Sequence, residues 1–241
     1  MDDRIPTLWD AEKVREGGDP GERRLNDVLR PTRLELGQQP AQLRLLVDHH
    51  ECGVYGARMA TTLDGIDAGL ADWLAGQPVF FVATAPRSDD QLINCSPKGL
   101  AGTFTVLDQH TVAYLDLTGS GVETIAHLRE NGRIVLMFCA FDGRPRIIRL
   151  HGRGRVVLPD DDAFGDLRSR FSDHPGVRSV IVVDVTRVSD SCGYGVPTMV
   201  YVEDRAVLDL SAEKRGEEGM VAYRRDRNST SLDGLPGLPL P

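Results

Sequence analysis

The sequence predicts a mainly β fold with flanking helices (α+β), built on an antiparallel barrel of six or seven strands. Three observations lead to this prediction. Short runs rich in β-branched and aromatic residues recur along the chain. Turn-forming residues separate several neighbouring runs by only a few positions, and helical patterns occur only at intervals. Because a doubly wound parallel sheet needs a helix after nearly every strand, the sequence favours strands joined by hairpins.

The first elements of this fold are one helix and two hairpins. Apolar residues at helical spacing between Ile66 and Leu74 predict a helix that ends at Gly76. Its N-cap is expected to be Thr62 or Asp64. The strands of the two expected hairpins are 79–85 with 92–96, and 103–107 with 111–115.

The later elements begin with a second helix. Ser120 and Glu123 have the spacing of a capping box, which predicts a helix that starts at Ser120 and stops near Gly132. A long apolar strand and its partner strand then flank the turn signal Asp142-Gly143. They are expected at 133–141 and 146–157, followed by a short helix around 164–171, strands at 179–188 and 198–202, a helix at 209–219 and an extended tail from 228.

Composition and charge exclude several classes of function. The net charge of −8 argues against a nucleic-acid surface, which needs clustered positive charge. The four cysteines are scattered without a C-x-x-C pair, so we expect no zinc site, no disulfide framework and reduced thiols. No apolar run reaches the roughly 18 residues that span a bilayer, and the first residues lack the apolar stretch of a secretory signal. We therefore expect a cytoplasmic protein without a membrane partner.

Residues 1–58 differ from the rest and are expected to be an N-terminal extension. They are rich in Arg, Gly and Pro and have few apolar periods. They could form an arm that docks on a partner subunit, be disordered, or precede the native start at Met59; we favour the last two interpretations. The predicted domain comprises residues 59–241.

The segment 94–99 is the first candidate site. Side chains alternate along a strand, so Asn94, Ser96 and Lys98 should share one face. A hydroxyl and an ammonium group together can hold a phosphate, although the residues alone equally fit a solvent-exposed strand end. Lys98 is one of only three lysines among 28 basic residues, which makes its presence here more informative.

Two further segments could contact an anion. The backbone N–H groups of a helix that starts near Ser120 can bind a phosphate, and Thr124 lies one turn further on the same side. Taken alone, Ser120 is better explained as a cap. Residues 149, 151, 153 and 155 share one face of a strand and include three arginines. This face is either a solvated outer surface or one that a carboxylate or phosphate neutralises.

The loop 191–197 places glycines on both sides of Tyr194, which indicates a tight turn. Cys192 in this loop is interpreted as a structural thiol rather than a nucleophile. The sequence has no H-E-x-x-H motif, phosphate-binding loop or serine-triad signature, so no catalytic residue is predicted.

Six segments in fixed order carry a family resemblance: 80–85, 94–99, 130–133, 149–154, 192–197 and 231–236. Together they resemble the pyridoxamine 5'-phosphate oxidase-like family of FMN-binding split β-barrels, over the range from about 64 to 236. The resemblance implies a homodimer with FMN at the subunit interface. It implies an FMN-dependent oxidoreductase acting on a small molecule that the sequence does not assign. The cofactor-binding residues that it implies are Ser96, Lys98, Ser120 and Thr124, with Arg149 for the same anion or for a substrate.

The chain also departs from the vitamin B6 oxidases of this family. Glu123 and Thr124 stand where those enzymes have basic phosphate ligands, and their C-terminal Trp and Arg substrate elements are not recognisable. These departures argue against pyridoxamine 5'-phosphate oxidase activity itself and for weaker FMN affinity. The alternative interpretation is a non-catalytic protein that binds flavin, haem or the deazaflavin F420 on the same barrel.

Overall fold

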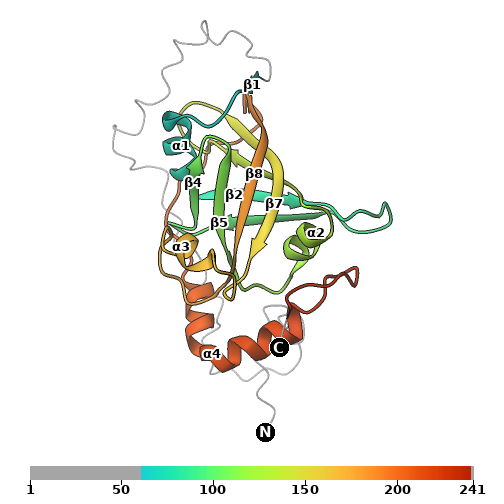
Figure 1. The fold of residues 1–241 in the computed structure, drawn as a ribbon. Helices are drawn as coiled ribbons and strands as arrows, with labels where there is room; N and C mark the ends of the chain where they lie inside the picture. The colour runs from blue at the N-terminus through green and yellow to red at the C-terminus, as the bar shows by residue number, and fades with distance from the viewer. Residues whose placement is uncertain (1–60, 240–241) are drawn as a thin grey trace, which may run out of the picture. The chain divides into compact units, whose positions relative to one another are not determined.

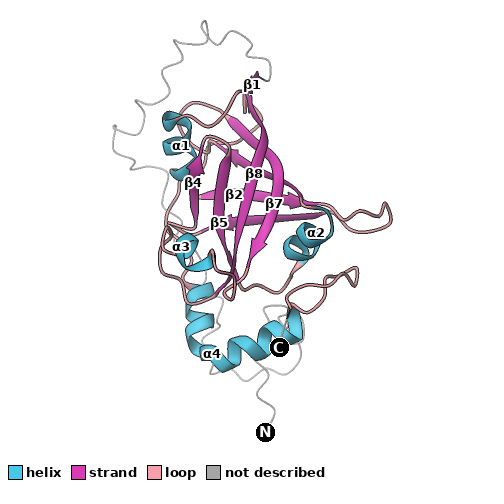
Figure 2. Cartoon of the chain, in the orientation of Figure 1, coloured by secondary structure: helices cyan, strands magenta, loops and turns pink. Residues whose placement is uncertain are grey.

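A computed structural model describes residues 61–239, which contain one curled antiparallel sheet (Figures 1 and 2). The strand order is β3-β2-β6-β7-β8-β5-β4, and β1 pairs separately with β8. The predicted mainly β, antiparallel split barrel is thus confirmed. The strands are β1 (Thr61–Leu63), β2 (Val79–Thr84), β3 (Asn94–Gly99), β4 (Phe104–Asp108), β5 (Thr111–Leu117), β6 (Arg133–Cys139), β7 (Ile147–Val157) and β8 (Val177–Ser191).

Helices lie around the sheet and at its ends. They are α1 (Ala68–Ala75), α2 (Glu123–Asn131), α3 (Phe164–Arg168) and α4 (Val207–Arg227). Helix α4 lies at the end of the sheet opposite β1 (Figure 1). Helix α2 ends where the sequence predicts, because Gly132 adopts a left-handed conformation (φ 70°) and its N–H bonds the Leu128 carbonyl oxygen.

The main core fills the concave side of the sheet. Its centre is aromatic: the ring of Phe80 lies 5.1 Å from Phe138 and 5.6 Å from Tyr114. Leu136 is fully buried in the same cluster. A second apolar cluster forms where Phe171, which follows α3, packs with residues of β5 and β8. Burial of the apolar side chains in these two clusters supplies the main driving force for folding of the barrel.

The expected caps of the first two helices are wrong. Asp67 caps α1, because its Oδ1 accepts a hydrogen bond from the Leu70 N–H at 2.7 Å, whereas Thr62 belongs to β1. Helix α2 starts at Glu123, so Ser120 lies too far upstream to cap it. The Glu123 carboxylate instead accepts from the Leu232 N–H at 3.3 Å, which directs it toward the C-terminal tail.

The strand expected at 198–202 is also wrong. These residues have no strand partner among residues 61–239, and the side chains of Val200 and Val202 are 87% and 84% exposed. The Met199 N–H makes the one backbone bond of this segment to other described residues, to the Phe141 carbonyl oxygen at 2.8 Å. Strand propensity without a paired neighbour is not enough to form a strand. The helix expected at 209–219 is α4, which is longer and kinks at Gly216.

The tail after α4 packs back against α2. Leu238 is buried in the main core, and Gly237 lies so close to Val122 that a side chain would clash. Arg129 of α2 donates to the Gly237 carbonyl oxygen, and Asn228 donates to that of Gly119 at 3.1 Å. The tail is therefore part of the folded domain. The predicted boundary near Met59 and the extension 1–58 lie outside the described residues.

Candidate functional site

Strand β3 is an edge strand whose polar face points toward α2. The Asn94 amide connects the two elements: its Nδ2 donates to Thr124 Oγ1 at 3.1 Å, and its Oδ1 accepts from Ser96 Oγ at 3.1 Å. Thr124 is buried in the first turn of α2, and Ser96 is half-buried. Two residues of the predicted site, Ser96 and Thr124, are thus joined through Asn94. The structure places Asn94, Ser96 and Lys98 on one face, as the strand alternation predicts.

The same network continues into the interior through β2. Asn94 Nδ2 also lies 3.1 Å from Thr84 Oγ1, and that hydroxyl is hydrogen-bonded to His127 Nδ1 at 2.9 Å. His127 is fully buried, and its Nε2 has no hydrogen-bond partner among residues 61–239. Burial lowers the pKa of His127, so the neutral imidazole is favoured.

Lys98 faces a buried carboxylate. Its Nζ lies 3.3 Å from Asp116 Oδ1, and the Asp116 side chain is fully buried whereas that of Lys98 is 20% exposed. Arg178 of β8 holds the same carboxylate, with Nε 2.6 Å from Oδ2. Ser179 adds a hydrogen bond at 3.2 Å. We call Lys98, Asp116 and Arg178, with the nearby Arg224, the Asp116 cluster.

The electrostatics of the Asp116 cluster favour an ionised aspartate. Burial raises the pKa of Asp116, but the charges and hydrogen bonds of Arg178 and Lys98 outweigh burial and lower that pKa to about 2. Burial, followed by the positive charge of Arg178, lowers the pKa of Arg224. The four groups comprise three cations and one carboxylate, so positive charge is in excess here.

Two residues of the predicted site lie elsewhere. Ser120 is exposed and lines a separate cavity of about 160 Å³ beside α4. Arg149 lies on β7, separated from β3 by β2 and β6, and on the outer face of the sheet because its neighbours Ile148 and Leu150 are in the core. Its Nη1 contacts Ser191 Oγ at 3.3 Å. The structure therefore brings together Ser96, Lys98 and Thr124, but not Ser120 or Arg149.

The predicted cationic face of β7 is an outer face. His151, Arg153 and Arg155 are exposed, and Arg149 is half-buried. Partial desolvation of the imidazole, followed by the positive charges of Arg187 and Arg149, lowers the pKa of His151. This face thus has the excess of positive charge that the sequence indicates.

Sequence reasoning missed Asp116, Arg178 and His127. A signal existed for Asp116, since a carboxylate inside the otherwise apolar run 112–117 requires a buried partner. No comparable signal distinguishes Arg178 from the many other arginines, or His127 from an ordinary helix residue. Over residues 61–239, no group of three or more His, Cys, Asp or Glu side chains is placed to hold a metal ion. No helix in that range is both long and apolar enough to cross a bilayer.

Comparison with known proteins identifies the family. The family model described as pyridoxamine 5'-phosphate oxidase matches residues 66–192. The pyridoxamine 5'-phosphate oxidase family protein ustO of Aspergillus flavus is 43% identical over 193 residues, covering 73% of this chain and 76% of the relative. The chain belongs to the pyridoxamine 5'-phosphate oxidase family, as the resemblance in the sequence predicts.

Solved structures with detectable similarity are more distant. A variant of HupZ from Group A Streptococcus is 22% identical with a TM-score of 0.40, covering 52% of this chain and 98% of that one. A FAD-binding protein of Mesorhizobium loti is 16% identical with a TM-score of 0.39, covering 55% and 96%. An FMN-binding protein of Syntrophomonas wolfei is 16% identical with a TM-score of 0.36, covering 46% and 75%. The family assignment rests on the sequence matches.

Proposed function

We propose that this protein is an FMN-dependent oxidoreductase of a small-molecule substrate, with the flavin phosphate held by Ser96, Lys98 and Thr124. The observation that carries the proposal is the position of Lys98 in a chain of this family. Its ammonium group is partly exposed and uses one of its three N–H donors on Asp116, so two donors remain for a phosphate. Ser96 lies on the same face of β3, two residues away.

The residues present fit a phosphate group. The Asp116 cluster has three cations for one carboxylate, and such an excess is suited to a bound anion. Glu123, the acidic residue in the first turn of α2, is turned toward the Leu232 N–H of the tail. Its carboxylate is therefore engaged by the tail and not by the residues of β3.

The protein's own contribution would be binding and orientation. When bound, the flavin supplies the hydride-transfer chemistry. Lys98 would neutralise phosphate charge, while Asn94 fixes the side chains of Ser96 and Thr124 relative to each other. The core residues of β2, which pairs with β3 in the sheet, exclude water from one side of this region.

Cofactor loading tests the proposal directly. The purified protein is expected to retain FMN through gel filtration, to show the visible flavin absorption band, and to lose that band when a physiological electron donor is added. A protein that takes up no added FMN would refute the proposal. Bound flavin that no donor reduces on a useful timescale would leave a binding protein rather than an oxidoreductase.

Lys98→Ala should weaken FMN retention by about 10- to 100-fold, the loss expected for one charged hydrogen bond to phosphate. Lys98→Arg keeps the positive charge beside Asp116 and should retain most of the affinity. Arg155→Ala removes an exposed cation from β7 and is the matched control. Dissociation constants from flavin fluorescence quenching check this expectation; equal affinities for Lys98→Ala and the unaltered protein would remove Lys98 from the site.

The proposal includes a cytoplasmic homodimer with the cofactor at the subunit interface. The three described cysteines are free thiols, as expected in a reducing compartment. A group of apolar side chains stands exposed after β8 and in α4, which is typical of a surface that a partner covers. Its members include Val200, Val202, Val207 and Leu210. Light scattering should give twice the chain mass of 26.4 kDa, and a monomer at micromolar concentration would contradict this part.

A further inference from the structure

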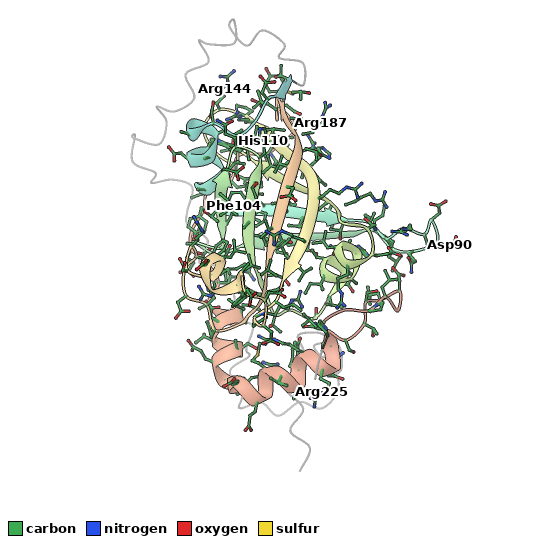
Figure 3. The ribbon with its side chains drawn as sticks, in the orientation of Figure 1. Asp90, Phe104, His110, Arg144, Arg187 and Arg225 are labelled. Carbon is green, nitrogen blue, oxygen red and sulfur yellow. The ribbon has the colours of Figure 1, made fainter. Side chains whose placement is uncertain are left out.

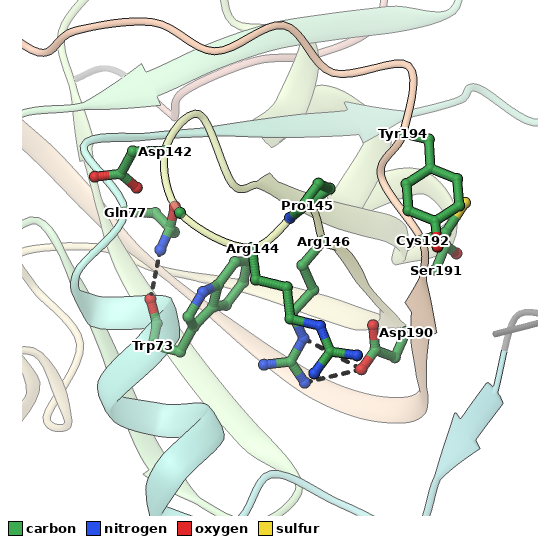
Figure 4. A pocket seen from close by; sticks show the side chains of 11 residues that line it. Trp73, Gln77, Asp142, Arg144, Pro145, Arg146, Asp190, Ser191, Cys192 and Tyr194 are labelled. Carbon is green, nitrogen blue, oxygen red and sulfur yellow. Dashed lines mark hydrogen bonds and ion pairs between the residues drawn. The ribbon is translucent and has the colours of Figure 1, made fainter. Parts of the chain in front are cut away.

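A second cavity lies away from the proposed flavin site. It has a volume of about 500 Å³ and is formed where the β6–β7 turn faces α1 and the segment that follows β8 (Figure 4). This volume is within the range of small-molecule sites. The cavity lies at the end of the sheet where Figure 3 labels Arg144. Arg225, on α4, is labelled at the opposite end. The residues that matter below are Trp73, Arg144, Arg146, Asp190, Ser191 and Tyr194.

The walls of this cavity are fixed to each other. Gly193 adopts a left-handed conformation (φ 68°), and a Cβ there would lie 2.5 Å from the Arg146 backbone nitrogen, so only glycine fits. The Met199 N–H adds a backbone bond to the Phe141 carbonyl oxygen at 2.8 Å, and the Ala140 N–H closes the β6–β7 turn itself by bonding the Arg146 carbonyl oxygen at 2.9 Å. The loop that carries Tyr194 is thus held against the β6–β7 turn, and the cavity is preformed.

One arginine in the cavity is locked in place. Arg146 donates from Nε and Nη2 to Asp190 Oδ2 at 3.2 and 2.9 Å. Its guanidinium carbon also lies 5.0 Å from the centre of the Trp73 ring, within range of a cation–π interaction. The Arg146 guanidinium is therefore fixed in the wall of the cavity, and its Nε and Nη2 groups already donate to Asp190.

A second arginine lies on the same side and is available. Arg144 is exposed, and its guanidinium is turned toward Asp190 beside that of Arg146 (Figure 4). It has no hydrogen bond or ion pair to any residue in the part of the chain that the structure describes.

On the side of the cavity where the arginines lie, the described residues carry one positive charge in excess. The guanidinium groups of Arg144 and Arg146 lie beside one carboxylate, that of Asp190 (Figure 4). Figure 4 shows Asp142 on the Gln77 side, away from the arginines. An excess of one favours a singly charged anion over a phosphate dianion. The rings of Trp73 and Tyr194 supply apolar, flat surfaces for the rest of such a ligand.

We propose that this cavity binds a small aromatic carboxylate, whose carboxylate group pairs with the Arg144 guanidinium while its ring lies between Trp73 and Tyr194. A planar guanidinium matches a carboxylate with two parallel hydrogen bonds. The site is separate from Ser96 and Lys98, because β3 lies four strands from β8 in the sheet order. It gives a role to the 192–197 loop and to the arginine-rich hairpin, which the flavin site does not use.

Benzoate is the probe that tests this site. The chain has two tryptophans, so full-length Trp9→Phe protein leaves Trp73 as the only indole reporter, and that residue lines the cavity. Benzoate titrated into this protein without added flavin should change the Trp73 fluorescence saturably. In the same background, Arg144→Gln should raise the dissociation constant by about tenfold or more, the loss expected for a charged hydrogen-bonded pair.

Two controls make the result specific. Arg155→Gln removes another exposed arginine, which lies on β7 outside the cavity, and Lys98→Ala alters the proposed flavin site. Both variants should leave the dissociation constant for benzoate unchanged. An absent or non-saturable response, or an unchanged constant in Arg144→Gln, would overturn the proposal. Inorganic phosphate that binds as tightly as benzoate would overturn the aromatic carboxylate assignment. Because no flavin is present, these outcomes are independent of the FMN tests.

Discussion

Replacing Asp116 with alanine should lower the free energy of unfolding by about 3–5 kcal/mol, because it leaves a buried cation without its partner. The Arg178 side chain is only 4% exposed, and its Nε lies 2.6 Å from the Asp116 carboxylate. Lys98 and Ser179 lose the same acceptor. Urea denaturation followed by circular dichroism measures the change.

The chain offers a matched control for this experiment. Arg168 and Asp173 also form an ion pair at 2.6 Å, but the Asp173 side chain is fully exposed to solvent. Because exposed pairs contribute about 0–1 kcal/mol, Asp173→Ala should have a small effect. Equal losses in the two variants would show that burial of the Asp116 carboxylate does not determine its contribution.

The stability should also depend on pH in a defined direction. The pKa of Asp116 is 3.8 in the unfolded reference and about 2 in the folded protein, so its ionisation stabilises the fold above pH 3.8. This contribution, about 2 kcal/mol from the size of the shift, is lost as the pH falls toward 2. The difference in unfolding free energy between the unaltered protein and Asp116→Asn should therefore shrink between pH 4 and pH 2. A constant difference over this interval would contradict the assignment of the charged form.

Leu136→Ala should lower the free energy of unfolding by about 2–5 kcal/mol, because it opens a cavity in the centre of the main core. Leu136 is fully buried on β6, next in the pairing to Val82 of β2 and Leu150 of β7. All three side chains lie inside the curled sheet, where little relaxation can fill the space. Thermal and urea denaturation both measure the loss.

Leu232→Ala makes the same chemical change on the surface. The Leu232 side chain is 80% exposed, and its contact with Glu123 is made by the backbone N–H, which the substitution keeps. Its effect should stay within about 0.5 kcal/mol. A loss as large as that of Leu136→Ala would mean that the tail contributes more apolar burial than its exposure indicates.

The fold could be predicted from local patterns wherever those patterns coincide with burial. Strands β2 and β6 are runs of apolar residues, whereas β7 alternates core residues with exposed polar ones. All three are bounded by proline or turn residues, and their expected and observed bounds differ by no more than two residues. The 198–202 run shows where this reasoning fails. Its residues have strand propensity, but strand formation depends on a neighbouring strand that local sequence does not specify.

The site was predictable to the extent that strand alternation determines it. Alternation alone places Asn94, Ser96 and Lys98 on one face, and the structure agrees. The partners of that face come from β5 and α2, and their proximity to β3 follows from closure of the barrel. Sequence spacing carries no information on such contacts, which is why Asp116 and His127 were missed.

The order of synthesis gives the packed tail a further consequence. Arg178 donates to the Asn228 side chain at 2.9 Å, and these residues are 50 positions apart. At roughly 5–20 residues per second, Asn228 is added about 3–10 s after Arg178. The last barrel strand, β8, is complete once Ser191 is added, and from then until the tail is made Val122 and the core position that Leu238 later fills remain uncovered. The nascent chain is therefore most open to aggregation and chaperone capture just before its tail emerges.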